Sequence, residues 1–152
     1  LNMETAPVSS NNFLRYCQEG FYEGTIFHRV IDGFMAQTGD PTGTGTGYSD
    51  LPDLKAEFND TRHMEGVASM ARAASPNSAN SQWFIMLDDA PHLDGQYTAW
   101  GKVVEGMEHV HAIKKGDQFN GAVTNPDKIV KMQIAADAEG EAAPANEAAA
   151  SE

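Results

Sequence analysis

The chain of 152 residues is 41% apolar and 9% aromatic, which is enough for one domain with a buried core. Its formal net charge of -12 argues against nucleic acid and anionic membrane surfaces as partners, because binding to phosphate groups requires a surplus of Lys and Arg. Cys17 is the only cysteine, which excludes an internal disulfide and a cysteine-based zinc site. No run approaches the ~18 to 20 consecutive apolar residues of a membrane span.

The first predicted element is a helix that begins at Ser9 and ends at Gly20. Ser9 is a preferred N-cap residue, Val8 before it is placed to pack against Phe13, and glycine is common just past a helix end. Short β-type runs bounded by Gly, Pro and Asp follow at residues 25–31, 34–38, 66–71, 82–87 and 98–104. This punctuation predicts a mostly antiparallel β domain.

Two further elements are predicted later in the chain. Residues 107–115 predict a helix, because apolar residues share one stripe, two lysines occupy the last turn and a glycine follows. Residues 128–135 alternate between apolar and polar side chains, which predicts a half-buried strand.

The composition changes at residue 137. From there the chain is rich in Ala and Glu and carries five acids and no base. Such a segment has too little apolar surface to pack, so we expect a disordered acidic tail at 137–152. The folded domain is then expected at residues 1–136.

An arginine interrupts a predicted strand in segment 27–40. Two short runs meet at Asp32-Gly33, so they predict a hairpin, and strand alternation places Arg29 on the face opposite His28. Taken alone, such an arginine is most common at a strand edge or barrel rim, where its role is structural.

Two more segments change that interpretation. Residues 69–87 read Ser-Met-Ala-Arg-Ala, then a polar loop, then Gln-Trp-Phe-Ile-Met-Leu. Residues 91–103 read Pro-His-Leu-Asp-Gly-Gln-Tyr-Thr-Ala-Trp-Gly-Lys-Val. Together with segment 27–40 they resemble, in order and spacing, the three signature blocks of the cyclophilin-type peptidyl-prolyl cis/trans isomerases, of the bacterial-like kind. The resemblance covers roughly residues 6–135.

The resemblance implies a fold and a domain. The expected fold is mainly β: a closed eight-stranded antiparallel cyclophilin barrel capped by two helices, with the active site on the outer barrel surface. The family's first strand pair is almost absent from the sequence, so we expect residues 1–136 to be an N-terminally truncated isomerase domain with an exposed sheet edge.

The resemblance also implies the site residues. The expected catalytic residues are Arg29, Phe34 and Gln37. The expected substrate-binding residues are Met35, Ala71, Arg72, Ala73, Gln82, Phe84, His92, Leu93 and Tyr97. Among these, the apolar pocket for the proline ring consists of Phe34, Met35, Phe84 and Leu93. No metal and no cofactor are expected.

The chemistry of the reaction explains these residue types. Rotation about an X-Pro amide bond faces a barrier of ~18 to 20 kcal/mol, because the twisted state loses the resonance of the planar bond. The prolyl nitrogen then gains a localised lone pair, which the Arg29 guanidinium is able to hydrogen-bond. The planar ground state offers no such acceptor, so the contact stabilises the transition state selectively.

The expected partners are proline-containing polypeptides, bound by a monomer in the cytoplasm, although a periplasmic form stays open. His92 stands where the cyclosporin-sensitive eukaryotic members have tryptophan, and Tyr97 where they have histidine. Both changes predict that cyclosporin binds only weakly. An alternative function stays open as well: a proline-binding module whose catalysis is lost or incidental.

Other motifs carry weaker signals. His109 and His111 are two apart on a predicted helix and point away from each other, so they do not suggest a metal site. Residues 43–47 alternate Gly and Thr without the Lys of a phosphate loop, and are expected to form a flexible loop beside the site. Ser, His and Asp all occur, but without the strained nucleophile turn of a hydrolase.

Overall fold

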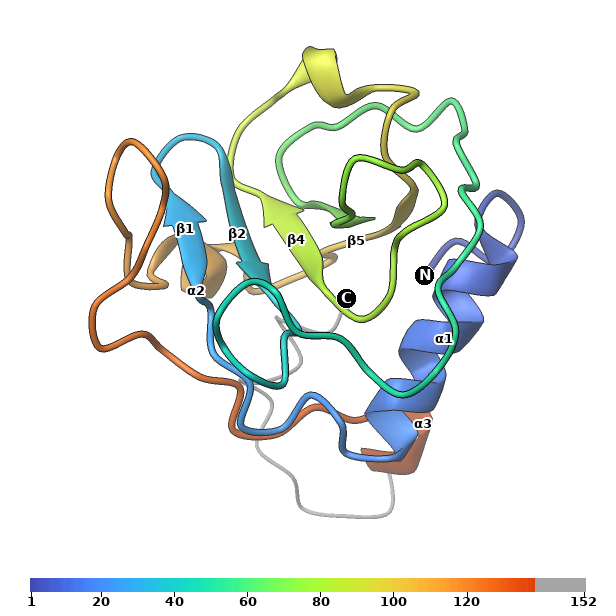
Figure 1. The fold of residues 1–152 in the computed structure, drawn as a ribbon, viewed down its shortest axis with the longest axis horizontal. Helices are drawn as coiled ribbons and strands as arrows, with labels where there is room; N and C mark the ends of the chain where they lie inside the picture. Colours follow the sequence, from blue (N-terminus) through green and yellow to red (C-terminus); the bar gives the residue numbers. More distant parts are fainter. Residues whose placement is uncertain (139–152) are drawn as a thin grey trace.

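Residues 1–138 are described by the computed structural model, which is built around one antiparallel sheet (Figure 1). The helices are α1 (Pro7–Gln18), α2 (Met107–His111) and α3 (Ala135–Ala138), and a 3-10 turn, η1, spans Pro91–Leu93. The strands are β1 (Arg29–Ile31), β2 (Met35–Thr38), β3 (Val67–Met70), β4 (Trp83–Met86) and β5 (Ala99–Lys102). The strand order is β1-β2-β4-β3-β5.

The predicted antiparallel β architecture is confirmed, but the predicted closed eight-stranded barrel is not. Within residues 1–138 the sheet has five strands, and its edge strands β1 and β5 do not pair with each other. Other segments cover both edges. The backbone of Val30 in β1 exchanges hydrogen bonds with Gly116 and Gly121, and the carbonyl of Trp100 in β5 accepts the Asn2 N–H at 2.7 Å. Covered edges do not offer unpaired backbone groups to another strand.

Helix α1 begins two residues before the predicted N-cap, Ser9, so that prediction is wrong. Pro7 occupies the first turn, where its missing N–H and fixed φ suit a helix start. The Glu57 carboxylate accepts the N–H groups of Val8 and Ser9 at 3.0 and 2.9 Å. A carboxylate from a distant loop thus caps the helix in place of a local side chain. The predicted end is confirmed, since Gly20 follows the helix with φ +70.

The C-terminal elements differ more from the predictions. Helix α2 ends at His111, earlier than predicted, and the Lys115 ammonium donates to the His111 carbonyl at its C-terminal end. The strand predicted at 128–135 is wrong. Ile129 and Met132 are buried while Val130 is 81% exposed, a spacing of three that no strand produces.

The C-terminal turn α3 takes part of that segment. It spans the last residue of the predicted strand and the first two residues of the predicted tail. Residues 139–152, the rest of that tail, lie outside the described residues. None of the helices in the described part of the chain has the length and apolarity needed to cross a membrane.

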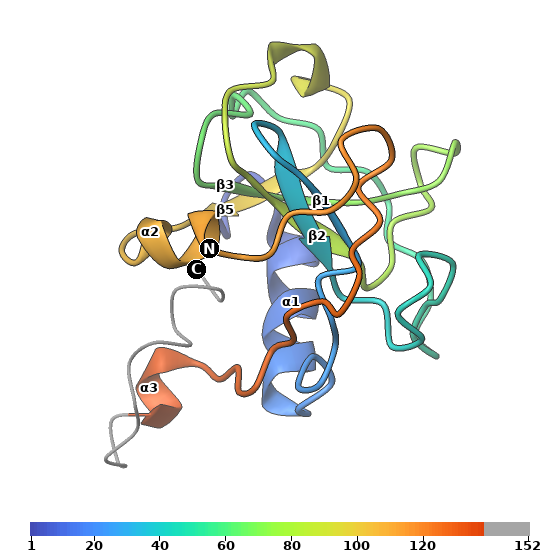
Figure 2. The ribbon, with the colours of Figure 1, turned by 90° about the vertical axis from the view of Figure 1, so that its left-hand side faces the viewer.

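Strand β4 separates two apolar clusters, because successive side chains on a strand point to opposite faces. Trp83 and Ile85 belong to the main core, and Phe84 and Met86 belong to a second cluster on the other face. Helix α1 lies along the sheet on the side of the main core (Figure 2) and contributes Phe13, which packs between aromatic rings. The second cluster lies under the surface that holds the candidate site.

We expect the Phe13→Ala variant to lose about 3 to 5 kcal/mol of unfolding free energy, as is usual for a large core aromatic residue. The Phe13 ring centroid lies 4.3 Å from that of Trp100 and 5.3 Å from that of Trp83, so truncation leaves a cavity between them. Urea denaturation measures the loss. The matched control is Phe119→Ala, since Phe119 is 94% exposed, and its stability should change by less than about 0.5 kcal/mol. Equal losses in the two variants would contradict this packing.

Candidate active site

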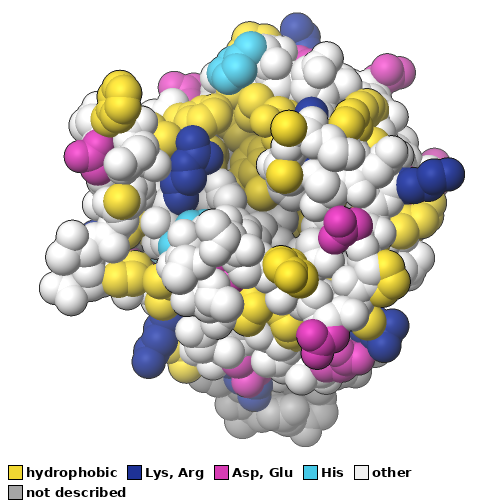
Figure 3. Space-filling view, viewed as in Figure 1, with side chains coloured by type: hydrophobic (Ala, Val, Ile, Leu, Met, Phe, Trp, Pro, Cys, Tyr) yellow, Lys and Arg dark blue, Asp and Glu magenta, His cyan; other side chains and the backbone are white. Residues whose placement is uncertain are grey.

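A surface cavity of about 520 Å³ lies over the second apolar cluster (Figure 3). Apolar side chains line the hollow, and a basic side chain stands at its rim. The residues that line it are His28, Arg29, Phe34, Met35, Gln37, Thr44, Gly45, Ala71, Arg72, Phe84, His92, Leu93, Tyr97, Asn120 and Ala122. Ten of the twelve predicted site residues are in this set.

The remaining two predicted residues, Ala73 and Gln82, line a neighbouring cavity of about 660 Å³ instead. The two cavities share Gln37, Gly45 and the Ala71-Arg72 backbone segment. A peptide bound across both cavities would therefore stay in contact with the protein along its length.

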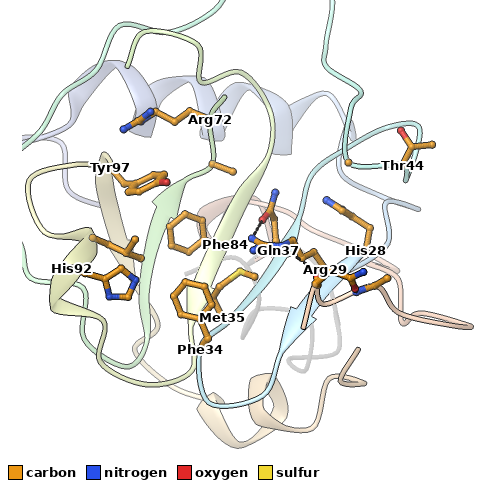
Figure 4. Close-up of a pocket in the computed structure, with 15 residues that line it drawn as sticks. His28, Arg29, Phe34, Met35, Gln37, Thr44, Arg72, Phe84, His92 and Tyr97 are labelled. Atoms are coloured by element: carbon orange, nitrogen blue, oxygen red, sulfur yellow. Dashed lines mark hydrogen bonds between the residues drawn. The ribbon is translucent and has the colours of Figure 1, made fainter. Parts of the chain in front are cut away.

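The register of three strands aligns three of the predicted site residues. Arg29 in β1 lies opposite Gln37 in β2, and Gln37 lies opposite Phe84 in β4. Residues directly opposite in an antiparallel pair share a face with short Cβ separations. The strands thus set cation, amide and aromatic ring in one row across the sheet (Figure 4).

A one-directional chain of hydrogen bonds holds the cation. Arg29 Nη1 donates to Gln37 Oε1 at 3.2 Å, and Gln37 Nε2 donates to Gln82 Oε1 at 2.9 Å. Gln82 Nε2 in turn donates to the carbonyls of Gly45 and Gly47, both at 3.1 Å. A guanidinium only donates, so it fixes the orientation of both amides along the chain. Gln37 is therefore placed to hold Arg29 in position.

The apolar half of the cavity is built from Phe34, Met35, Phe84 and Leu93. Met35, Phe84 and Leu93 are buried, and Phe34 packs against the same cluster. Its ring stacks on that of His92, with centroids 5.9 Å apart. The Phe84 ring meets Tyr97 edge to face at 6.0 Å. These contacts fix the walls of a pocket of the size and apolarity that suit a small ring.

Arg72 lines both cavities. Its guanidinium lies 4.6 Å from the centre of the Tyr97 ring and donates to the Gln96 carbonyl from Nε and Nη2. These contacts turn the side chain towards the protein's own wall, and Ala71 and Arg72 line the cavity together.

The Gly-Thr loop beside the cavity is held by a buried carboxylate. Asp40 accepts the N–H groups of Thr42, Gly45 and Gly47 and the Thr42 hydroxyl. Burial raises the pKa of Asp40, but the hydrogen bonds from Gly47, Thr42 and Gly45 outweigh it and lower the pKa to about 2. The loop was expected to be flexible, and this set of bonds instead fixes its backbone.

Three parts of the site were not predicted as site residues. His28 precedes β1, so strand alternation does not hold there and its ring reaches the cavity. Burial lowers the pKa of His28, which the nearby Asp40 carboxylate raises in part. Thr44 and Gly45 come from the neighbouring loop. Asn120 and Ala122 come from a loop that crosses beside β1, and the Asn120 carbonyl accepts Arg29 Nε at 3.3 Å. No sequence pattern marks that contact.

The charges and acids of the described chain define the kind of chemistry available. Within residues 1–138, no group of three or more His, Cys, Asp and Glu is arranged to hold a metal ion. A cation held by neutral acceptors beside an apolar cavity can donate a hydrogen bond to an acceptor atom of a group bound there. The fold and site thus define a protein of mainly antiparallel β structure with a cation held beside an apolar surface cavity.

Comparisons with known proteins agree with that class. The family profile described as cyclophilin type peptidyl-prolyl cis-trans isomerase/CLD matches residues 1–134. A probable peptidyl-prolyl cis-trans isomerase of Brucella suis is 51% identical over 149 residues, covering 90% of this chain and 76% of that protein. The human peptidyl-prolyl cis-trans isomerase-like 3 is 44% identical over 116 residues, covering 74% of this chain and 71% of that protein.

A solved structure agrees as well. The crystal structure of a Cryptosporidium parvum cyclophilin type peptidyl-prolyl cis-trans isomerase, determined in the presence of the dipeptide Ala-Pro, superposes with a TM-score of 0.79 at 32% identity and covers 87% of both chains. The chain belongs to the cyclophilin-type peptidyl-prolyl cis-trans isomerase family. It is an enzyme with the activity of that family.

We expect Asp40→Asn to lower the unfolding free energy by about 1 to 3 kcal/mol, because the new amide group faces N–H donors that need an acceptor. Since folding lowers the pKa of Asp40, its contribution is full above about pH 4 and is lost as the pH falls towards 2. Urea unfolding at pH 7 and at pH 3 measures both effects. The control is Asp50→Asn, whose exposed carboxylate lies in the same region. An equal change in both variants would contradict the anchoring role.

Proposed function

We propose that Arg29 is the catalytic donor and that Phe34, Met35, Phe84 and Leu93 hold the proline ring of the substrate. The observation that carries this proposal is the row formed by Arg29, Gln37 and Phe84 across three strands, with the guanidinium fixed beside the pocket. The same row supports a positioning role for Gln37.

The proposed mechanism requires no covalent step. The pocket fixes the ring while the carbonyl on the other side of the amide bond swings, and Arg29 donates to the prolyl nitrogen as it becomes pyramidal. A preorganised donor in a site shielded from water stabilises such a state by ~3 to 4 kcal/mol. Gln37 keeps the Arg29 guanidinium in place while the amide bond rotates, because the Gln37 amide is itself hydrogen-bonded to Gln82.

The proposed substrates are flexible proline-containing segments of other polypeptides, whose folding the enzyme assists. The two adjoining cavities support this, since residues before the proline have a surface to lie on. The related Cryptosporidium structure was determined with Ala-Pro, a dipeptide of the proposed chemical class.

We expect Arg29→Ala to lower kcat/KM for a proline peptide by roughly a hundredfold or more, while peptide affinity stays within about threefold. The reason is that the guanidinium acts on the twisted state and the pocket binds the ring. A protease-coupled isomerisation assay measures the rate, and calorimetry measures binding. Arg29→Lys should also be slow, because a flexible ammonium does not reproduce the planar donor.

The matched control is Arg15→Ala, an arginine on α1 whose side chain pairs with Glu19 at the surface. Its kcat/KM should equal that of the wild type. If Arg29→Ala kept more than about a third of the activity, Arg29 would not be the catalytic donor.

We also propose that His92 weakens cyclosporin binding. His92 is exposed at the cavity rim and stacks on Phe34, where an imidazole offers less apolar area than an indole. At ~25 cal/mol per Å² the difference corresponds to about 1 to 3 kcal/mol, or roughly 5- to 150-fold in affinity. Titration of cyclosporin against the wild type and His92→Trp should show tighter binding to the variant. Equal affinities would mean that the rim position does not control this ligand.

A further inference from the structure

A buried histidine lies directly beneath the proposed proline pocket. The His63 side chain is 0% exposed, and its ring stacks on Phe84 at a centroid distance of 6.3 Å and an interplanar angle of 25°. Nδ1 lies 3.2 Å from Asp94 Oδ1, and Nε2 lies 2.9 Å from the Ser69 hydroxyl. In the β3–β4 register Ser69 is the partner of Phe84, so His63 touches both members of that pair.

This Ser-His-Asp arrangement is not a hydrolytic site. Ser69 is 0% exposed and lies within β3, a strand paired on both sides. A nucleophile must reach its substrate, and this hydroxyl does not reach any surface. The arrangement therefore has another role. Buried polar groups are costly unless they are hydrogen-bonded, and a fully bonded network makes the residues that it joins rigid.

The His63 backbone is hydrogen-bonded to both ends of η1, the turn that forms the outer wall of the pocket. Its backbone N–H donates to Asp94 Oδ1 at 2.6 Å, and its carbonyl accepts the Ala90 N–H at 2.8 Å. Ala90 and Asp94 flank η1, which carries His92 and Leu93. One residue therefore holds the floor of the pocket through Phe84 and its wall through η1.

We propose that His63 is a positioning residue for substrate binding, and that it acts as a neutral imidazole with its proton on Nδ1. The Asp94 carboxylate accepts from Nδ1, so Nε2 is left to accept the Ser69 hydroxyl proton. With the proton on Nε2, the Ser69 hydroxyl would accept instead of donate, and the bare Nδ1 would face the Asp94 carboxylate with no proton between them. This inference rests on the proposed role of the pocket as the proline site.

The charged and titratable groups that face the imidazole come from both sides of the turn. They are Asp94, Arg62, whose Nε lies 3.9 Å from the other Asp94 oxygen, and His92. Burial lowers the pKa of His63, although Asp94 raises it in part. Because the folded state disfavours the proton, His63 stays neutral to a pH below the ordinary histidine pKa of about 6.5, and the arrangement is lost as the pH falls through its lowered pKa.

The test separates substrate binding from turnover. For His63→Phe, which keeps the ring against Phe84 but removes both hydrogen bonds, we expect KM for a proline peptide to rise about three- to tenfold with kcat nearly unchanged. Ser69→Ala should raise KM in the same direction by less, and it serves in place of the first variant if that one does not fold. In the double variant the KM should rise less than the product of the two single effects, because no unpaired hydroxyl remains.

Two further measurements complete the test. The KM of the wild type should stay constant through the ordinary histidine pKa of about 6.5 and rise only as the pH falls further. This rise should be absent in His63→Phe but present in the control His109→Phe, whose side chain is 62% exposed on α2. Nitrogen-15 NMR of the imidazoles should show the His63 proton on Nδ1 at pH 7. A lower melting temperature with unchanged KM in both variants, or a proton on Nε2, would overturn the inference. If Arg29→Ala retained activity, the proposed site itself would be wrong, whatever the result at His63.

Discussion

The structure depends on the alternation of side chains along β4, whose residues are all buried. Trp83 and Ile85 pack into the core under α1, while Phe84 and Met86 support the cavity. The same strand is therefore a wall of both compartments. A slip of one residue in its register would exchange the two sets, placing an indole under the cavity and removing the ring that supports the pocket. Fold stability and site geometry are linked through this one strand.

Both sides of the pocket rely on hydrogen-bonded networks in which donors match acceptors. On the cation's side, the chain runs from Arg29 through two glutamines to loop carbonyls, and the loop itself is fixed by Asp40. On the other side, His63 joins β3 to the turn after β4. A half-satisfied network would leave the low-dielectric site with costly unpaired groups. Matched networks allow polar residues, including Arg29 and Gln37 in the cavity wall, to fix the apolar side chains beside them.

Local pattern predicted the strand nuclei, whereas the candidate site residues were assigned through the resemblance to the cyclophilin family. Alternation and turn residues mark the hairpin at Asp32-Gly33, and the site residues cluster in three segments that the strands bring together. Contacts between distant segments do not produce any local pattern in the sequence. The Glu57 carboxylate that caps α1 is 48 residues from Ser9, and Asn120 reaches Arg29 across 91 residues. The segment 128–135 alternates like a strand, yet burial of Ile129 and Met132 prevailed over that pattern.

The absence of a carboxylate partner for Arg29 is as important as its position. The chain carries a formal charge of -12, yet within residues 1–138 Arg29 forms no ion pair. Its acceptors are the Gln37 amide oxygen and the Asn120 carbonyl, both neutral. A nearby carboxylate would satisfy the guanidinium and reduce its attraction for a lone pair that exists only in the twisted amide. Neutral acceptors fix the direction of the cation and leave its charge available for the proposed contact with the substrate. Asp40, the buried acid that holds the Gly-Thr loop, directs its oxygens to backbone N–H groups and a threonine hydroxyl.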